Sequence, residues 1–366
     1  MALELADIFR QYGSAYRQKY ASRMPSSHFK AMRAIEQCRT PALGGQVYRC
    51  PNCEQVQYSY HSCRNRHCPK CQNEKAQNWL EKQQDLLLPV PYFLLTFTLP
   101  AAFNEVARSH QKLFYDLLFK TSAAATQQLA QDPRRMGGQI GMVGVLHTWG
   151  RNLAYHPHVH YLVPGGGLSM DEQSWLPARN HFFLPVRALS RIFRGNLQKA
   201  LRHTNCYARI PANVWQQEWV VHCEEVGSGL NALKYLAPYI FRVAISNNRI
   251  LKLENDRVTF RYRDTETGTE KRCTLAAEEF IHRFLQHVLP HHFVKVRYYG
   301  FFAPTRRSRL TTLRHSLLAT ADAQPADPTA TPPGSPALQP HTILCPHCGQ
   351  PMLFQRTLPP TLCRSP

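Results

Sequence analysis

The sequence predicts an α+β fold in which a sheet with helices on one face follows a small zinc-binding region. Two observations carry this prediction. Segments that alternate residue by residue, as strands do, and segments with the longer helical period follow one another through the middle of the chain. Before them, six cysteines lie between residues 38 and 71, and four of these form two CxxC pairs.

Composition divides the chain into four predicted parts. Residues 1–88 contain the cysteine-rich region and are expected to form a zinc-binding domain, and residues 89–318 are expected to form the sheet domain. Residues 319–340 are rich in Ala, Pro, Thr and Ser, cannot bury a core and are expected to be a disordered linker. Residues 341–366 remain as a short tail.

The elements are expected in a definite order. Helices are predicted over residues 74–88, 104–131, 187–203, 230–242 and 278–289, and strands over 93–99, 140–148, 156–163, 218–223 and 293–302, with short strands across 250–274. The helix over 187–203 is basic and amphipathic.

Charge points to a polyanionic partner. The chain has 366 residues, with 44 Lys and Arg against 24 Asp and Glu, a net charge of +20 that is spread along the sequence. Such an excess suits nucleic acid, because neutralised phosphates release counterions. The alternative is a soluble basic protein with solvated charged faces.

The compartment is expected to be the cytoplasm. The start of the chain lacks the basic and apolar regions of a signal peptide, and the longest apolar run, residues 90–99, is too short to span a membrane. Twelve cysteines in such a chain favour metal thiolates over disulfides.

The two CxxC pairs predict zinc. Cys50 and Cys53 are separated from Cys68 and Cys71 by fourteen residues, and two such pairs can supply one closed tetrahedral site. Four more candidate ligands bring the total to eight, enough for a second four-coordinate site: His28, Cys38, Cys63 and His67. The alternative is a set of reduced structural thiols. Basic side chains in the same loop are candidate contacts to DNA phosphates: Arg64, Arg66 and Lys70.

The tail contains one more CxxC pair, Cys345 and Cys348, with Cys363 near the end. These residues make an incomplete site unless His341 or His347 contributes. A vestigial or dimer-shared zinc site and a metal-free tail both remain open.

Three histidines predict a second kind of metal site. His158 and His160 are two residues apart on a predicted strand, so both side chains point to the same face. His147 ends the preceding strand and could complete a three-histidine face with open coordination positions, which suits chemistry better than structure. The alternative is that these are structural residues in a chain with 18 histidines.

Two tyrosines are candidate nucleophiles. Tyr235 and Tyr239 lie four residues apart in a predicted helix, so their hydroxyls would share a face. A tyrosine can attack a phosphodiester and form a covalent phosphotyrosine, with a nearby metal ion polarising the phosphate. The alternative is core packing. Pro238 could place Tyr235 just before the helix and make the two tyrosines inequivalent.

Together these motifs resemble a known family. Residues 62–71, 146–150, 156–167 and 235–247 carry the likeness, which covers about residues 25–305 in the family's order. The chain resembles transposases of the insertion-sequence ninety-one type, which are rolling-circle elements with an HUH (His, hydrophobe, His) endonuclease and tyrosine nucleophiles.

The resemblance implies a ferredoxin-like HUH endonuclease domain, built as an antiparallel sheet with helices on one face. It implies His158 and His160 as ligands of Mg²⁺ or Mn²⁺. The third ligand varies in the family, and here His147 fits best by strand position, with His156 as the fallback. Tyr235 and Tyr239 would cleave single-stranded DNA at the element's end, leaving a 5′-phosphotyrosine and a free 3′-hydroxyl, and rejoining would occur at a new target.

Two other functions remain possible from the sequence. One is a plasmid replication initiator or relaxase with the same nicking chemistry, although the N-terminal cysteine cluster favours the transposase. The other is a zinc-dependent DNA-binding regulator whose histidines and tyrosines only pack the core.

Overall fold

The computed structural model describes residues 3–71, 87–179, 182–228, 231, 240, 243–264, 267–321 and 343–361. Most of two predicted helices, over 74–88 and 230–242, therefore lies outside the described residues, and so do Tyr235 and Tyr239. In the described part of the chain, no helix is long and apolar enough to cross a membrane.

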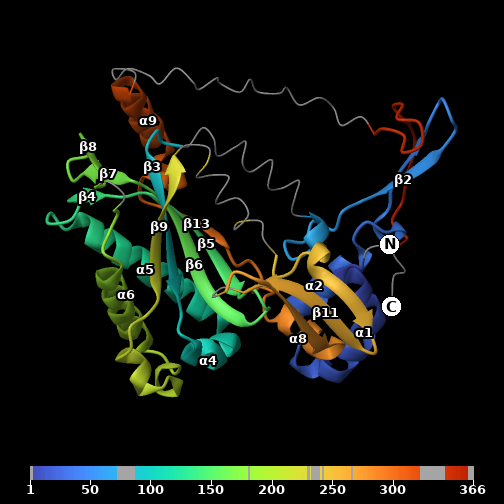
Figure 1. Ribbon diagram of the computed structural model, residues 1–366, viewed down its shortest axis with the longest axis horizontal. Helices are drawn as coiled ribbons and strands as arrows, with labels where there is room; N and C mark the ends of the chain where they lie inside the picture. The colour runs from blue at the N-terminus through green and yellow to red at the C-terminus, as the bar shows by residue number, and fades with distance from the viewer. Residues whose placement is uncertain are drawn as a thin grey trace.

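A five-stranded sheet forms the centre of the larger lobe (Figure 1). Its strands are, in spatial order, β13 (Val296–Tyr299), β5 (Met142–Trp149), β6 (Tyr155–Pro164), β3 (Pro91–Thr98) and β9 (Val221–Ser228). Each pair of neighbours is antiparallel. The fold is therefore α+β with an antiparallel sheet, as the sequence predicts.

One face of this sheet carries the helices α4 (Asn104–Ser109), α5 (Gln111–Gln131) and α6 (Val186–Leu201). Alternate residues of β3, such as Phe93 and Phe97, point into this core together with Phe119 of α5 and Phe193 of α6. The single helix predicted over 104–131 is split into α4 and α5, because His110 leaves the helical conformation with φ −129° and ψ 44°.

The opposite face is apolar at one end and carries histidines at the other. Its apolar end, with Leu94 of β3 and Val145 of β5, packs against Leu310 and Leu313 of α9 (Arg307–Ala321). Towards the other end of the same strands come Thr96, His147, His158 and His160, which the strand period puts on this face. The polar side chains of this face therefore lie at the end of the sheet that α9 does not cover.

The predicted strand over 293–302 is shortened to β13, because Gly300 turns the chain with φ +59°. A Cβ at Gly300 would lie only 1.9 Å from the carbonyl oxygen of Ile140, so no larger residue fits this turn.

A second core joins the N-terminal helices to a later part of the chain. Helices α1 (Leu5–Tyr20) and α2 (Ser26–Gln37) pack on α8 (Ala277–Leu285) and on a sheet of β10 (Ile250–Glu254), β11 (Arg257–Arg263) and β12 (Glu270–Ala276). The rings of Phe9 and Phe284 meet edge to face with centroids 5.5 Å apart. This core crosses the division predicted at residue 88, since residues far apart in sequence bury their apolar faces together.

Two small sheets complete the fold. One pairs β4 (Gly138–Gln139) with β7 (Gly166–Ser169) and β7 with β8 (Trp175–Pro177). The other contains β1 (Gly45–Arg49) and β2 (Val56–Tyr60), and on its other side β14 (Leu353–Leu358) of the C-terminal tail. The tail is thus a strand of the N-terminal sheet, and α9 extends to residue 321, into the segment predicted as linker.

Candidate active site and metal centres

Three histidines come together on the part of the central sheet that α9 does not cover. His147 of β5 lies directly opposite His158 of β6, and His160 follows on the same face of β6. One ring nitrogen from each lies within 4.8 Å of the others. This group contains the histidine expected from strand position, His147, and not the fallback His156, whose side chain is exposed.

The rings of His158 and His160 are held through their Nδ1 atoms. Nδ1 of His158 lies 2.7 Å from the backbone oxygen of His156, to which it can donate, and Nδ1 of His160 lies 2.9 Å from Oγ1 of Thr96. Such contacts orient a histidine ligand, and with Nδ1 engaged, Nε2 is the atom that would bind a metal ion. His147 and His160 are almost fully buried, which limits access by water.

A second layer of side chains connects the histidines to Ile240. The ring of Trp149 stacks on His147 with centroids 4.7 Å apart, and Nζ of Lys295 lies 5.3 Å from the centroid of Trp149. The same Nζ donates a hydrogen bond of 2.9 Å to the backbone oxygen of Ile240. Desolvation of its ammonium group, and the nearby charge of Arg66, lower the pKa of Lys295 to about 7. Ile240 follows Tyr239 directly in the sequence.

His287 supports the turn between β5 and β6. Its Nδ1 lies 3.3 Å from Oγ1 of Thr148 and its Nε2 lies 3.2 Å from the backbone oxygen of Leu153. Burial lowers the pKa of His287 to about 4, so the ring is neutral at pH 7. We assign it to the structure rather than to a metal site.

The sequence did not identify these supporting residues: Thr96, Trp149, His287 and Lys295. Trp149 lies within one of the motifs that carried the family resemblance, but the contacts of the other three depend on strand neighbours that a single sequence does not specify.

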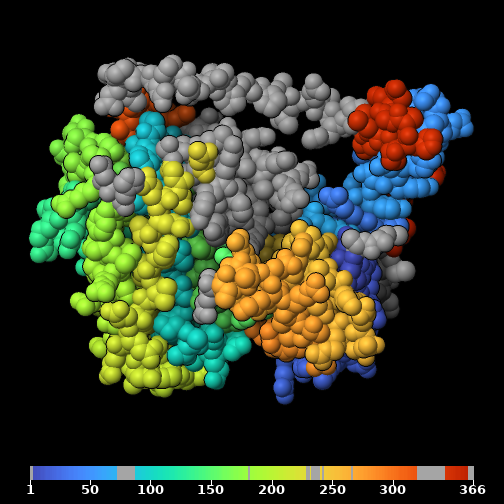
Figure 2. All heavy atoms as spheres, viewed as in Figure 1, coloured from blue at the N-terminus to red at the C-terminus, as the bar shows by residue number. Residues whose placement is uncertain are grey.

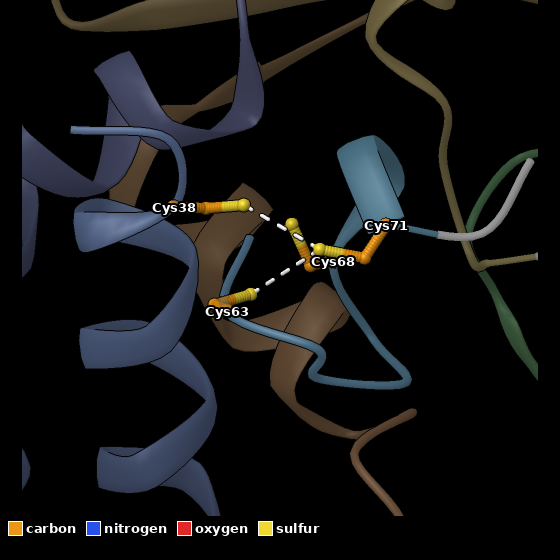
Figure 3. Close-up of side chains that lie close together, drawn as sticks. All are labelled: Cys38, Cys63, Cys68 and Cys71. Carbon is orange, nitrogen blue, oxygen red and sulfur yellow. Dashed lines mark hydrogen bonds between the residues drawn. The ribbon is translucent and has the colours of Figure 1, made fainter. Parts of the chain in front are cut away.

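The first cysteine cluster consists of Cys38, Cys63, Cys68 and Cys71 (Figure 3). Cys38 follows α2, and the other three come from the loop after β2. Sγ of Cys71 lies 3.5 Å from that of Cys38 and 3.6 Å from that of Cys63. Contact with Cys38 raises the pKa of the Cys63 thiol, whereas contact with Cys63 lowers the pKa of Cys38, so the thiols favour one thiolate at the expense of a neighbour. A bound cation would stabilise the thiolates together.

The second cluster consists of Cys50, Cys53, Cys345 and Cys348. This grouping corrects the predicted one, in which Cys50 and Cys53 share a site with Cys68 and Cys71. Because β2 carries the chain away between the two N-terminal pairs, each pair finds other partners, and the tail pair completes a set of four.

Neither His28 nor His67 belongs to a cluster among the described residues, contrary to expectation. Nε2 of His67 accepts a hydrogen bond of 3.3 Å from the backbone nitrogen of Leu289. Burial lowers the pKa of His67 to about 3 and that of His28 to about 4, which makes both neutral packing residues.

Two of the three predicted DNA contacts bind other residues of the protein, although Arg66 is exposed and Lys70 is half-buried. Arg66 donates to the backbone oxygens of Phe293 and Pro290, at 2.6 and 3.1 Å, and so fastens the cysteine loop to the segment before β13. Lys70 forms an ion pair of 2.5 Å with Glu4. Arg64 is exposed.

Comparisons with known proteins agree with this arrangement. A family model described as "Transposase zinc-binding domain" matches residues 8–99, and one described as "Putative transposase" matches residues 141–309. A Sinorhizobium fredii protein named "Putative transposase y4qJ" is 42% identical over 347 residues, which are 89% of this chain and 87% of the relative. The transposase for insertion sequence element IS801 of Pseudomonas savastanoi pv. phaseolicola is 30% identical over 287 residues, 73% of this chain and 68% of that protein.

The chain belongs to the transposases of the insertion-sequence ninety-one type. Transposases act on DNA, which agrees with the net charge of +20, and the zinc-binding family model agrees with structural zinc at the cysteines. In this transposase the three clustered histidines fall within the second matched range, whereas Cys345 and Cys348 lie outside both. No solved structure matches the chain.

Proposed function

We propose that this transposase is an HUH-type endonuclease and strand transferase that cuts single-stranded DNA by tyrosine attack. The observation that carries the proposal is the convergence of His147, His158 and His160 on one sheet face, with the rings of His158 and His160 held through Nδ1. Holding a histidine through Nδ1 orients its other ring nitrogen towards a metal ion, which is the usual arrangement of histidine ligands.

The three histidines would hold a divalent ion, Mg²⁺ or Mn²⁺. The family resemblance implies these two ions, and as nitrogen donors the imidazoles favour Mn²⁺ over the harder Mg²⁺. Three neutral imidazoles also leave coordination positions open to phosphate oxygens and water. When bound, the ion would polarise the scissile phosphate and offset its added negative charge. Thr96 and the backbone of His156 would keep the imidazoles aimed at it.

Tyr235 and Tyr239 are the proposed nucleophiles. Attack by a phenolic oxygen forms a bond to phosphorus and breaks the bond to the 3′ oxygen, which takes up a proton. The products are a 5′-phosphotyrosine and a free 3′-hydroxyl, and the reverse attack by another 3′-hydroxyl joins strands at a new site. The link from Ile240 through Lys295 and Trp149 to His147 supports this assignment, because Ile240 follows Tyr239.

Two tyrosines would let donor and target strands be held in turn during rolling-circle transposition, although one-tyrosine members of related families manage with one. The basic character of the chain supports a single-stranded DNA substrate through contacts to the backbone phosphates.

The test uses the full chain with single-stranded oligonucleotides that carry candidate element ends, in the presence of Mn²⁺. We expect a covalent protein–DNA adduct on a denaturing gel that disappears in the Tyr235→Phe/Tyr239→Phe double variant. The matched control Tyr207→Phe removes a hydroxyl that is hydrogen-bonded to Gln198 and Arg202, and it should keep the adduct. An undiminished adduct in the double variant would exclude these tyrosines.

A second experiment separates a catalytic role of the histidines from a role in folding. His158→Ala should abolish nicking while binding of the same oligonucleotide persists, because the side chain would act on the phosphate rather than on the fold. Equal loss of binding and cleavage would show a structural role instead.

A further inference from the structure

The two CxxC pairs of the second cluster have the same backbone conformation, although one lies near the start and the other near the end of the chain. In the first, the nitrogen of Cys50 donates to Gln55 and that of Glu54 donates to Cys50, at 2.9 and 3.0 Å. In the second, the nitrogen of Cys345 donates to Gln350 and that of Gly349 to Cys345, at 2.8 and 2.9 Å.

The match extends to the turn and to the sequence. The residue after each second cysteine has positive φ, 59° at Glu54 and 74° at Gly349. The sequences are Cys-Pro-Asn-Cys-Glu-Gln and Cys-Pro-His-Cys-Gly-Gln, and each leads into a strand, β2 or β14. A turn of this kind lets both thiolates of a CxxC pair reach one ion, so the chain contains two halves of one zinc site.

The sulfur atoms have the separation that zinc requires. Sγ of Cys50 lies 3.4 Å from that of Cys348, and Sγ of Cys53 lies 3.5 Å from that of Cys345, with all four within 4.8 Å of one another. A tetrahedron with Zn–S bonds of about 2.3 Å places sulfurs about 3.8 Å apart. A disulfide would need about 2.05 Å.

The surrounding lobe has little other means of stability. Its core consists of Cys50, Cys345 and Met352, whereas Leu353 and Phe354 of β14 are more than half exposed. Three short strands with so small a core are marginal in water, so metal binding would supply most of the free energy that orders them.

We propose that Cys50, Cys53, Cys345 and Cys348 bind one zinc ion that fastens the C-terminal tail to the N-terminal zinc-binding lobe. This composite site, called here the terminal clasp, closes a loop that contains the whole central sheet. Figure 2 shows the tail packed on the lobe of β1 and β2 at one corner of the molecule. The site does not depend on the endonuclease mechanism.

Zinc content tests the clasp. The full chain should contain two zinc ions per molecule by elemental analysis, and the Cys345→Ser/Cys348→Ser variant should contain one. The control Cys273→Ser removes a cysteine that belongs to neither cluster and should retain two. One zinc ion in the wild type, or two in the double variant, would overturn the proposal.

Attachment of the tail is tested by cutting the chain. A protease site placed within residues 322–342 of the full chain allows the tail to be severed after folding. We expect the severed tail to elute with the body in size-exclusion chromatography, and to separate from it in the double variant or after chelation. Separation from the wild type with zinc present would contradict the clasp.

Molar mass distinguishes a clasp within one chain from one shared between two copies. We expect the uncut wild type and the double variant to have the same molar mass by light scattering. A wild-type dimer that becomes a monomer in the double variant would show that the tail binds a second copy, and the clasp within one chain would be wrong.

Discussion

At the scale of single residues, the surroundings of a buried histidine distinguish a candidate metal ligand from a structural residue. His147, His158 and His160 lie together on one sheet face, whereas His287 is enclosed alone and neutral. The period of two residues in a strand was enough to select His158 and His160 from the sequence, but it could not reveal that Thr96 lies opposite His160, since that contact depends on which strand pairs with β6.

The hydroxyl of Thr96 should matter to metal affinity. Thr96→Val keeps the shape of the side chain but removes the hydrogen bond to Nδ1 of His160. Loss of such a supporting contact typically costs about 10- to 100-fold in metal affinity or activity. We therefore expect nicking to fall by about that factor at low Mn²⁺, with partial recovery at high Mn²⁺.

The control for this variant is Thr126→Val, which removes a buried hydroxyl bonded within α5. It should show the wild-type dependence of nicking on Mn²⁺. If nicking by Thr96→Val depended on Mn²⁺ as it does in the wild type, the hydrogen bond between Thr96 and His160 would have no role in positioning His160.

His287 should make the fold sensitive to acid. Because its folded-state pKa of about 4 lies below the ordinary 6.5, the unfolded chain binds the proton more tightly between these values. The stabilisation by neutral His287 is complete above pH 6.5 and is lost as the pH falls towards 4. At pH 5 the loss amounts to about 2 kcal/mol.

Denaturant unfolding at pH 7.5 and pH 5 measures this effect. Between the two, the free energy of unfolding should fall by about 2 kcal/mol more for the wild type than for His287→Gln. The exposed His203→Gln should follow the wild type. Equal losses in the wild type and His287→Gln would mean that other groups cause the acid sensitivity.

At the scale of elements, local pattern was sufficient for most strands and insufficient for their ends. The run of apolar residues in 93–99 corresponds to β3, because burial of both faces of this strand selects apolar residues at successive positions. The alternation at the start of 156–163 corresponds to the beginning of β6, where burial alternates between the two faces. The end of β13 depends on Gly300 meeting Ile140, a contact between distant segments. Patterns within a segment carry no information about such contacts.

Substitution of two glycines by alanine should change the stability of the protein in opposite directions. A Cβ at Gly144 in β5 would lie 2.5 Å from the ring of Tyr161, which is fully buried and bonded through its hydroxyl to Ser122. Gly144→Ala should therefore destabilise the protein by about 1–3 kcal/mol. A Cβ at Gly195 in α6 would meet no described atom within 4 Å, so Gly195→Ala should stabilise by up to about 1 kcal/mol.

Thermal unfolding of both variants checks these signs. An unchanged melting temperature for Gly144→Ala would mean that β5 and Tyr161 can move apart at little cost, contrary to the tight packing of this sheet.

At the scale of the whole molecule, partners far apart in sequence decide the arrangement. Cys50 and Cys53 appeared to belong with Cys68 and Cys71, the nearest pair, but their structural partners follow almost three hundred residues later. The sequence Cys-Pro-His-Cys-Gly-Gln in the tail repeats the pattern around Cys50 and Cys53, and this similarity could have indicated that the two pairs share a site. Spacing along the chain favours near partners, whereas strand pairing between β1 and β14 brings the ends together.

The two cysteine clusters should differ in what they stabilise. Cys38, Cys68 and Cys71 are buried in the core that joins α1, α2 and α8, whereas the second cluster lies in a lobe with a minimal core. Structural zinc sites contribute apparent binding free energies of about 10–16 kcal/mol in small domains. Cys68→Ser should therefore lower the main calorimetric melting transition of the chain, while Cys345→Ser/Cys348→Ser should leave that transition close to wild type and release only the tail. Equal destabilisation by the two sets of substitutions would show that the ends of the chain fold as one unit with the core.

Removal of zinc by a chelator should likewise have two phases. We expect a fast phase from the second cluster, in its exposed lobe, and a slow phase from the buried first cluster.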